Sequence, residues 1–280
     1  MRHRFSVHVL FAVVLAAAAN QSTSRAADDS PASPLPKPLV NVHAHNDYEH
    51  KHPLFDALDC GFCSVEADIN LVDGKLLVAH SRAAVKPNRT LQSLYLDPLR
   101  ERVKKYHGRV YPDGPPVWLL IDFKNSPKEM YPVLRKVLME YADILTTWEN
   151  GQKKQGAVTA ILTGDHPEES ILAGENIRYA AIDGILDALL RNPPSELVPW
   201  MSSQWSLSFK WRGDGPMPEI EVQKLHEIVD TAHKQGRLVR FWAAPDKISA
   251  WKTLRDAGVD LINTDDLKGA QAFLNSQSQS

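Results

Sequence analysis

Short apolar runs alternate with amphipathic stretches along the chain from residue 39 onward. The apolar runs predict eight strands, over residues 39–42, 63–69, 117–123, 157–163, 178–182, 200–203, 238–242 and 261–264. The amphipathic stretches predict helices over residues 54–58, 91–106, 128–141, 185–190, 219–234 and 248–257. Strands that alternate with helices predict a parallel sheet with helical crossovers. Eight such strands match the α/β fold of a single-domain (β/α)8 TIM barrel.

The first residues differ from the rest of the chain. A basic start, Met1-Arg-His-Arg, precedes an apolar run over residues 7–19 and small residues at 24–27. This order is typical of a secretory signal peptide, and the run is shorter than the roughly 20 residues of a membrane span. We therefore expect a signal peptide at 1–27, a flexible leader at 28–38, a barrel domain at 39–275 and a polar tail at 276–280. The mature chain would be exported, to a periplasm or outside the cell, without a transmembrane segment.

The composition narrows the set of partners. The 280 residues carry a formal net charge of -2, with 43% hydrophobic and 24% charged residues. No basic stripe or interleaving of aromatic and basic residues is present, which argues against nucleic acid as a partner. The balance is that of an ordinary globular protein with one large core.

Two carboxylates on one predicted strand carry the first chemical signal. Glu66 and Asp68 are two residues apart, so their side chains share a face, while the residues between them are apolar. Neighbouring carboxylates are a common way to hold a hard divalent cation, although acidic pairs on strands are more often solvated. His80 ends the apolar run at 76–79, and His45 follows the first strand. Together they predict a metal site flanked by two proton-transfer groups.

Several other polar residues end predicted strands. Asp122 and Lys124 end the third strand, two apart on one face; Trp242 ends the seventh, and Asn263 with Asp265 the eighth. A barrel brings the carboxyl ends of all its strands to one rim, where enzymes of this fold build their sites. A lysine beside a metal-binding carboxylate suits a phosphate group. This convergence on one rim is stronger evidence for a functional site than any single motif.

These residues together resemble a known superfamily. The set is His45-Asn46, Glu66-Ala-Asp68, Asp73-Gly74, His80, Asp122-Phe-Lys124 and the segment 258–265. It is similar to the phosphatidylinositol phospholipase C-like phosphodiesterases, which include glycerophosphodiester phosphodiesterases and sphingomyelinase D-like enzymes. The resemblance covers residues 39–274, with no matched motif between 143 and 215.

The resemblance implies a role for each matched residue. His45 and His80 would be the catalytic histidines. Glu66, Asp68 and Asp122 would hold one divalent cation, Mg²⁺ or Ca²⁺. The phosphate and substrate would contact Lys124, Asn46 and Trp242.

The implied reaction is cleavage of a glycerophosphodiester or phospholipid-type phosphodiester. One histidine would take a proton from the attacking hydroxyl, and the other would protonate the leaving oxygen. If water attacks, the reaction is hydrolysis; if a substrate hydroxyl attacks, a cyclic phosphate forms first. The partner is then a small phosphodiester or a lipid head group. His45-Asn46-Asp47 departs from the His-Arg-Gly of glycerophosphodiester phosphodiesterases, which leaves recognition of glycerol open.

Two other function classes remain as alternatives. His43-Ala-His45 after a first strand is also typical of metal-dependent amidohydrolases, with partial support from His166 and Asp265. That class leaves Glu66, Asp68 and His80 unexplained, and the sequence has no obvious lysine ligand on its fourth strand to support it. The other alternative is a barrel that binds a ligand without catalysis, although the catalytic set is complete.

Two further pairs of residues invite functional readings. Cys60 and Cys63 form a Cys-Gly-Phe-Cys motif between a helix end and a strand start, where we expect semi-buried thiols or a local disulfide. Trp205 and Trp211 lie in a segment with Gly and Pro after the sixth strand that we expect to fold over the mouth of the barrel.

Overall fold

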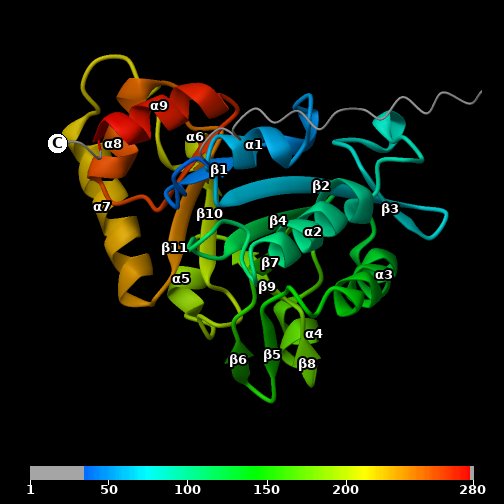
Figure 1. Ribbon diagram of the computed structural model, residues 1–280. Coiled ribbons are helices and arrows are strands. Elements are labelled where there is room, and N and C mark those ends of the chain that lie inside the picture. Colours follow the sequence, from blue (N-terminus) through cyan, green and yellow to red (C-terminus); the bar gives the residue numbers. More distant parts are fainter. Residues whose placement is uncertain (1–34, 278–280) are drawn as a thin grey trace, which may run out of the picture. The chain divides into compact units, whose positions relative to one another are not determined.

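The computed structural model describes residues 35–277 (Figure 1). The predicted signal peptide, most of the predicted leader and the last three residues lie outside the described residues. Residues 35–38 have no regular structure. The last helix runs to Gln277, two residues beyond the predicted end of the barrel domain.

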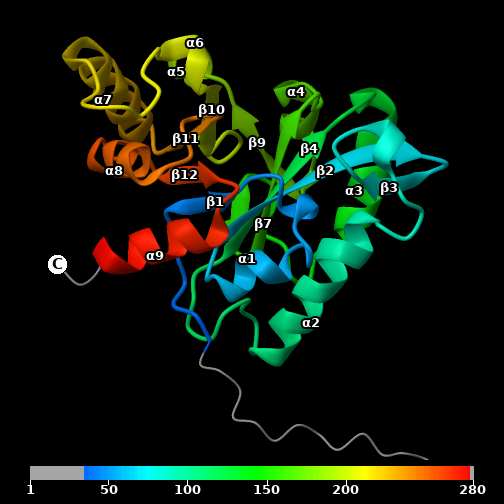
Figure 2. The same ribbon diagram turned by 90° about the horizontal axis from the view of Figure 1, so that it is seen from above.

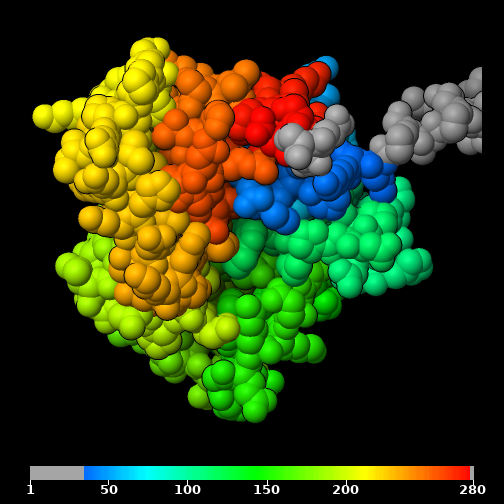
Figure 3. Space-filling view, turned by 90° about the vertical axis from the view of Figure 1, so that its left-hand side faces the viewer, coloured from blue at the N-terminus to red at the C-terminus, as the bar shows by residue number. Residues whose placement is uncertain are grey.

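Eight parallel strands close into a barrel, which confirms the predicted fold. In order around the barrel they are β1 (Val42–Ala44), β2 (Ser64–Val72), β4 (Val117–Phe123), β7 (Val158–Gly164), β9 (Ala180–Gly184), β10 (Trp200–Gln204), β11 (Leu238–Trp242) and β12 (Leu261–Thr264). Strand β1 pairs with both β12 and β2, which closes the ring. The blue start and the red and orange end of the barrel therefore lie side by side on the surface (Figure 3).

Helices cover the outside of the barrel (Figures 1 and 2). They are α1 (Phe55–Asp59), α2 (Asp97–Lys105), α3 (Pro127–Glu140), α4 (Glu169–Ala173), α5 (Ala188–Arg191), α6 (Trp205–Ser208), α7 (Glu219–Lys234), α8 (Ile248–Asp256) and α9 (Leu267–Gln277). Short turns of other helix types are η1 (Asp47–Glu49), η2 (Arg82–Ala84) and η3 (Gln92–Leu96). Within the described part of the chain, no helix has the length and apolar character needed to cross a bilayer.

Two of the predicted strands are displaced in the structure. The first was expected at 39–42, but β1 begins at Val42, because Leu39 forms an isolated bridge with Phe62 before the chain bends. The fifth was expected at 178–182, but Arg178 ends the short strand β8 and the barrel strand β9 begins at Ala180. The prediction failed there because the two strands follow each other with one residue between them.

Within residues 35–277, four short strands lie outside the barrel. Strand β3 (Lys75–Val78) forms an antiparallel hairpin with β2. A separate three-stranded sheet consists of β5 (Thr147–Glu149), β6 (Gln152–Lys154) and β8 (Ile177–Arg178). In this sheet the Arg178 guanidinium lies 4.0 Å from the centroid of the Trp148 ring. The sheet accounts for part of the segment in which the sequence offered no motif.

Alternation along β2 and β4 explains how the barrel orients its acidic residues. Val65, Ala67 and Ile69 belong to the large core between barrel and helices. Glu66 and Asp68 point the other way, into the barrel, because successive side chains of a strand face opposite sides. On β4, Leu120 likewise belongs to a small cluster inside the barrel. Asp122, two residues later, extends that inner face to the carboxyl end.

The two tryptophans expected at the barrel mouth are core residues instead. Trp205 is fully buried and Trp211 is nearly so. The Trp205 ring packs on Phe209 and Phe241, and its Nε1 donates a hydrogen bond to the Trp211 carbonyl. The segment after β10 therefore packs its aromatic side chains against the barrel wall.

Cys60 and Cys63 are free, buried cysteines in the structure. Burial raises the pKa of both thiols, that of Cys63 to about 12. A thiol held protonated in this way is a poor nucleophile, so the pair acts as small apolar packing residues.

Candidate active site

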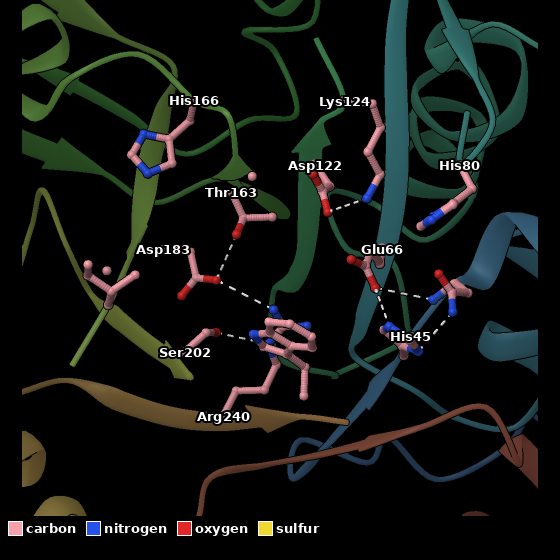
Figure 4. Close-up of a pocket in the computed structure, with 15 residues that line it drawn as sticks. His45, Glu66, His80, Asp122, Lys124, Thr163, His166, Asp183, Ser202 and Arg240 are labelled. Atoms are coloured by element: carbon pink, nitrogen blue, oxygen red, sulfur yellow. Dashed lines mark hydrogen bonds and ion pairs between the residues drawn. The ribbon is translucent and has the colours of Figure 1, made fainter. Parts of the chain in front are cut away.

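Polar side chains at the carboxyl ends of the barrel strands surround a cavity of about 430 Å³ (Figure 4). The predicted site residues that line it are His45, Asn46, Glu66, His80, Asp122, Lys124 and Trp242. The eighth, Asp68, is fully buried directly behind the wall. The structure therefore brings the predicted site residues together from four barrel strands, the turns that follow them and the segment after the hairpin strand β3, which carries His80.

The acidic trio consists of Glu66, Asp68 and Asp122. Asp68 and Asp122 are register partners on the adjacent parallel strands β2 and β4, and Glu66 precedes Asp68 on the same face. One carboxylate oxygen from each residue lies within 4.8 Å of the other two. Asp68 Oδ1 is buried without a hydrogen-bond partner among the described residues. Converging oxygens with a spare acceptor fit a hard cation such as Mg²⁺ or Ca²⁺.

Lys124 holds two members of the acidic trio together. Its Nζ lies 2.9 Å from Asp68 Oδ2 and 2.7 Å from Asp122 Oδ2. Burial raises the pKa of Asp122 to about 6, even though the Lys124 charge acts in the opposite direction. The same two carboxylates raise the pKa of Lys124 against the effect of burial, so the lysine is positively charged.

Glu66 is ionised and is fixed by the first strand. Its Oε2 accepts a hydrogen bond from the backbone N–H of Asn46 at 3.1 Å. The Nε2 atoms of His43 and His45 lie 3.7 Å and 3.9 Å from the same oxygen. Burial opposes ionisation, but the neighbouring His43 imidazole and the charge of Arg240 lower the pKa of Glu66 well below its ordinary value. The carboxylate is therefore a permanent negative charge in the wall.

His45 sits at the end of β1 between two acids. Its Nδ1 lies 2.9 Å from Asp265 Oδ1, and its Nε2 faces Glu66. Burial lowers the pKa of this imidazole, but the hydrogen bond to Asp265 and the Glu66 charge outweigh it and raise the pKa above 6.5. The two acids thus favour the protonated form of His45.

Tyr48 is a site residue that the sequence did not reveal. It lies on η1, and its side chain is almost fully buried. Its hydroxyl lies 2.6 Å from Asp68 Oδ2, 2.7 Å from Asn46 Oδ1 and 3.3 Å from His80 Nδ1. His80 Nδ1 itself lies 3.0 Å from Asp68 Oδ2. Tyr48 therefore connects the turn after β1 with the second histidine.

Gly164 allows β7 to approach the acidic trio closely. It has φ 70°, and a Cβ atom there would lie 2.0 Å from Asp122 Oδ1 and 2.7 Å from the Phe123 carbonyl oxygen. No side chain fits in this space without moving Asp122. A glycine at the end of an otherwise buried strand was the signal in the sequence that could have marked this position.

His43 is separated from the cavity in the structure. It is fully buried, its Nδ1 lies 2.7 Å from Ser64 Oγ, and burial lowers its pKa to about 4. It does not line the cavity, whereas His45 does. The His43-Ala-His45 pair therefore does not present two ligands side by side, as the amidohydrolase alternative requires.

The other half of the cavity is formed by polar residues that the sequence analysis did not single out for this site. Thr163, Asp183, Ser202 and Arg240 come from β7, β9, β10 and β11 and lie across the cavity from the acidic trio (Figure 4). Thr163, Asp183 and Ser202 each lie two positions after a buried apolar or aromatic residue on the inward face of the same strand. Arg240 lies two positions before Trp242. That spacing of two was the available signal.

Comparison with known proteins gives concordant matches. The sequence model of the AIM6-like phosphodiesterase domain matches residues 37–183, and that of the glycerophosphoryl diester phosphodiesterase family matches residues 239–268. Altered inheritance of mitochondria protein 6 from Eremothecium gossypii is 30% identical over 270 residues, which cover 84% of this chain and 69% of that protein. Its homolog from Arthroderma benhamiae is 28% identical over 263 residues, covering 84% and 83%.

A solved structure shares the fold. The crystal structure of a glycerophosphodiester phosphodiesterase from Parabacteroides distasonis matches with a TM-score of 0.51 and 15% identity, over 88% of this chain and 98% of that one. The matches confirm the predicted superfamily, the phosphatidylinositol phospholipase C-like phosphodiesterases. Within it, the chain belongs to the family of AIM6-like phosphodiesterase domains.

Proposed function

We propose that the protein is a metal-dependent phosphodiesterase that cleaves a glycerophosphodiester or phospholipid-type diester by acid/base catalysis with two histidines. The observation that carries this proposal is the acidic trio, Glu66, Asp68 and Asp122, bordered by His45, His80 and a charged lysine in one cavity. A divalent cation bound by the trio would withdraw negative charge from a phosphate oxygen. Family membership supports the reaction class.

Lys124 is the group that would meet the phosphate beside the trio. Its ammonium is charged and lines the cavity. A phosphodiester carries one negative charge, which increases on the phosphoryl oxygens as the nucleophile adds. A fixed positive charge at this point stabilises the transition state more than the ground state, which is the requirement for catalysis.

His80 is suited to remove the proton from the attacking hydroxyl. With Nδ1–H donating to Asp68, the Nε2 of neutral His80 is a hydrogen-bond acceptor. The imidazole side chain is 69% exposed and borders the cavity, so water or a substrate hydroxyl can reach it. Asp68 and Tyr48 keep the ring in this orientation, in the way that a buried carboxylate orients the histidine of a catalytic triad.

His45 is suited to protonate the leaving oxygen. Its Nδ1 lies within hydrogen-bond distance of Asp265, and its raised pKa favours the protonated imidazole, in which Nε2–H faces Glu66. The two histidines therefore differ in their carboxylate partners, Asp265 for His45 and Asp68 for His80. General acid and base groups of this kind contribute about 10²- to 10⁴-fold each.

The proposal is tested with the full chain and two substrates, bis(p-nitrophenyl) phosphate and glycerophosphocholine, each with Mg²⁺, with Ca²⁺ and with EDTA. We expect turnover that EDTA abolishes and added metal restores, and a loss of about a hundredfold or more in His45→Ala and Glu66→Gln. His226→Ala and Glu227→Gln, on the exposed face of α7, are the matched controls. Turnover that persists in EDTA, or in both site variants, would contradict the proposal.

A further inference from the structure

The loop between β11 and α8 lies behind the candidate active site and contains Asp246, which does not line the cavity. The first residue of the loop, Ala243, has φ 53°, a backbone conformation that residues with a Cβ rarely adopt. Such a conformation persists only where the surrounding contacts hold the chain in place. The contacts of Asp246, at the other end of this turn, are of that kind.

Both carboxylate oxygens of Asp246 accept hydrogen bonds. Oδ2 accepts from the backbone N–H of Asp265 at 2.9 Å, and Oδ1 accepts from Trp251 Nε1 at 2.9 Å. Asp265 directly follows β12, whereas Trp251 lies on α8. The carboxylate therefore joins the end of a barrel strand to a helix on the outside of the barrel.

Asp246 takes the place of a strand partner for Asp265. The pairing of β11 with β12 ends at Phe241 and Ile262, before β12 itself ends. A backbone N–H needs an acceptor, and beyond this point β11 no longer supplies one. The Asp246 side chain, which follows β11 in the chain, provides the acceptor instead.

Trp251 connects this contact to the protein core. It is 2% exposed, and its ring centroid lies 5.8 Å from that of Phe273 on α9. Hydrogen bonds to an ionised acceptor are stronger than those between neutral groups. The packing of α8 against α9 therefore sets the position of the Asp246 carboxylate.

The contact between Asp246 and Asp265 affects His45. The Asp265 side chain is 62% exposed, and its Oδ1 lies 2.9 Å from His45 Nδ1. The preceding carbonyl, that of Thr264, accepts from the His45 backbone N–H at 3.1 Å. An exposed side chain loses entropy when it is held in one conformation, so its backbone must be fixed for the contact to persist. Asp246 fixes that backbone on the side away from β1.

We propose that Asp246 is a positioning residue: by holding the Asp265 backbone, it keeps the His45 imidazole aligned with the leaving oxygen of the substrate. The inference rests on the proposed function for the role of His45 as the general acid. Asp246 acts through Asp265, because it does not line the cavity. Misalignment of the imidazole slows protonation of the leaving oxygen and leaves substrate binding unchanged.

Two substrates with different leaving groups test this role in the metal-loaded full chain. Glycerophosphocholine releases an alcohol, whereas bis(p-nitrophenyl) phosphate releases a stable phenolate that needs no proton from an acid. Asp246→Ala should lower kcat for glycerophosphocholine about ten- to a hundredfold with little change in KM, and kcat for the nitrophenyl diester by less than about threefold. His45→Ala should slow both reactions, because it also removes the imidazole that faces Glu66. Asp230→Ala, at an exposed position of α7, is the matched control.

A second variant tests the same contact from its other end. Trp251→Phe removes the donor to Asp246 Oδ1, so it should change the ratio of the two kcat values in the same direction by a smaller factor. A ratio that both variants leave unchanged would overturn the inference. An equal fall for both substrates would also overturn it, because a general loss of structure does not distinguish leaving groups.

NMR separates the inference from the proposed function. If the native chain cleaves neither substrate, the proposed function fails, and the His45 ring signals of the ¹⁵N-histidine-labelled, EDTA-treated full chain then test the positioning role. These signals are assigned by their loss in His45→Ala. A hydrogen-bonded Nδ1–H exchanges slowly with water, so its signal should be present in the native chain and in Asp230→Ala but absent in Asp246→Ala. A signal that persists in Asp246→Ala, or that is missing from the native chain, would overturn the inference.

Discussion

Asp47 offers a test of the electrostatics behind the active site. It begins η1, the turn that carries Tyr48, and its side chain is fully buried. Its Oδ2 accepts a hydrogen bond from the Leu54 backbone N–H at 2.6 Å and from the Tyr95 hydroxyl at 2.8 Å. Burial raises the pKa of Asp47 from 3.8 to about 7, against the effect of these two hydrogen bonds. Replacement by asparagine keeps an acceptor oxygen for both donors and removes the ionisation.

The shift converts into a dependence of stability on pH. A rise of about three units at about 1.4 kcal/mol per unit corresponds to roughly 4 kcal/mol. The folded state holds this proton more tightly than the unfolded state, so its stabilising contribution is complete below about pH 4 and is lost as the pH rises through about 7. Because asparagine does not ionise, the stability of Asp47→Asn does not fall in this way as the pH rises. The stability of the variant relative to the native chain should therefore increase by up to about 4 kcal/mol between pH 4 and pH 8.

Urea unfolding at pH 4, 6 and 8, with EDTA present throughout, measures this difference. The comparison isolates Asp47, because the acidic trio titrates in both proteins. Asp230→Asn, at an exposed position of α7, is the matched control for the substitution itself. A difference for Asp47→Asn that stays constant, or that decreases as the pH rises, would refute the reasoning.

Three further predictions concern the cavity. Tyr48→Phe removes the hydroxyl 2.6 Å from Asp68, so kcat for a phosphodiester should fall about ten- to a hundredfold in steady-state assays with a smaller change in KM; an unchanged kcat would contradict the positioning role. Gly164→Ala places a Cβ 2.0 Å from Asp122 Oδ1, so urea unfolding should show a loss of more than about 1 kcal/mol, and calorimetry a weaker affinity for Mg²⁺ or Ca²⁺. Excess Mg²⁺ or Ca²⁺ should raise the melting temperature of EDTA-treated protein. At a metal concentration one hundred times the Kd, the free energy of unfolding should increase by about 2.7 kcal/mol, and Glu66→Gln should lose most of this effect.

The acidic trio and its lysine could be predicted from the sequence because strand alternation is a local property. Glu66 with Asp68, and Asp122 with Lys124, each occupy one face of an apolar strand, and that spacing is visible without a structure. The barrel then brings the two strands together, because the same alternation of strands and helices specifies the fold. Site residues whose placement follows from strand alternation and from their position at a strand end could therefore be predicted from the sequence.

Tyr48 and the cavity residues Thr163, Asp183, Ser202 and Arg240 could not be recognised from the sequence in the same way. Tyr48 lies in a polar turn, and its value to the site comes from contacts with Asp68 and His80, twenty and more residues away. Arg240 lies in the middle of an apolar strand, where a lone charged residue is usually read as solvent-facing. Whether such a side chain points into the barrel depends on the register with neighbouring strands, which a single sequence does not contain.

The displaced strands have a similar explanation. β8 and β9 are separated by one residue, Tyr179, and form one continuous apolar pattern in the sequence. Only the pairing of Arg178 with Trp148 assigns the first piece to another sheet. Local pattern thus predicts that a strand exists, while tertiary pairing decides where it begins and which sheet it joins.

The measurement that tests the central claim most directly is ³¹P NMR of glycerophosphocholine or glycerophosphoinositol incubated with the metal-loaded full chain. The account predicts that the diester resonance is replaced by that of a phosphomonoester or a cyclic phosphate, and that Glu66→Gln and His45→Ala prevent the conversion. A diester resonance that persists in both substrates with the native chain, or that disappears equally fast with both variants, would contradict it.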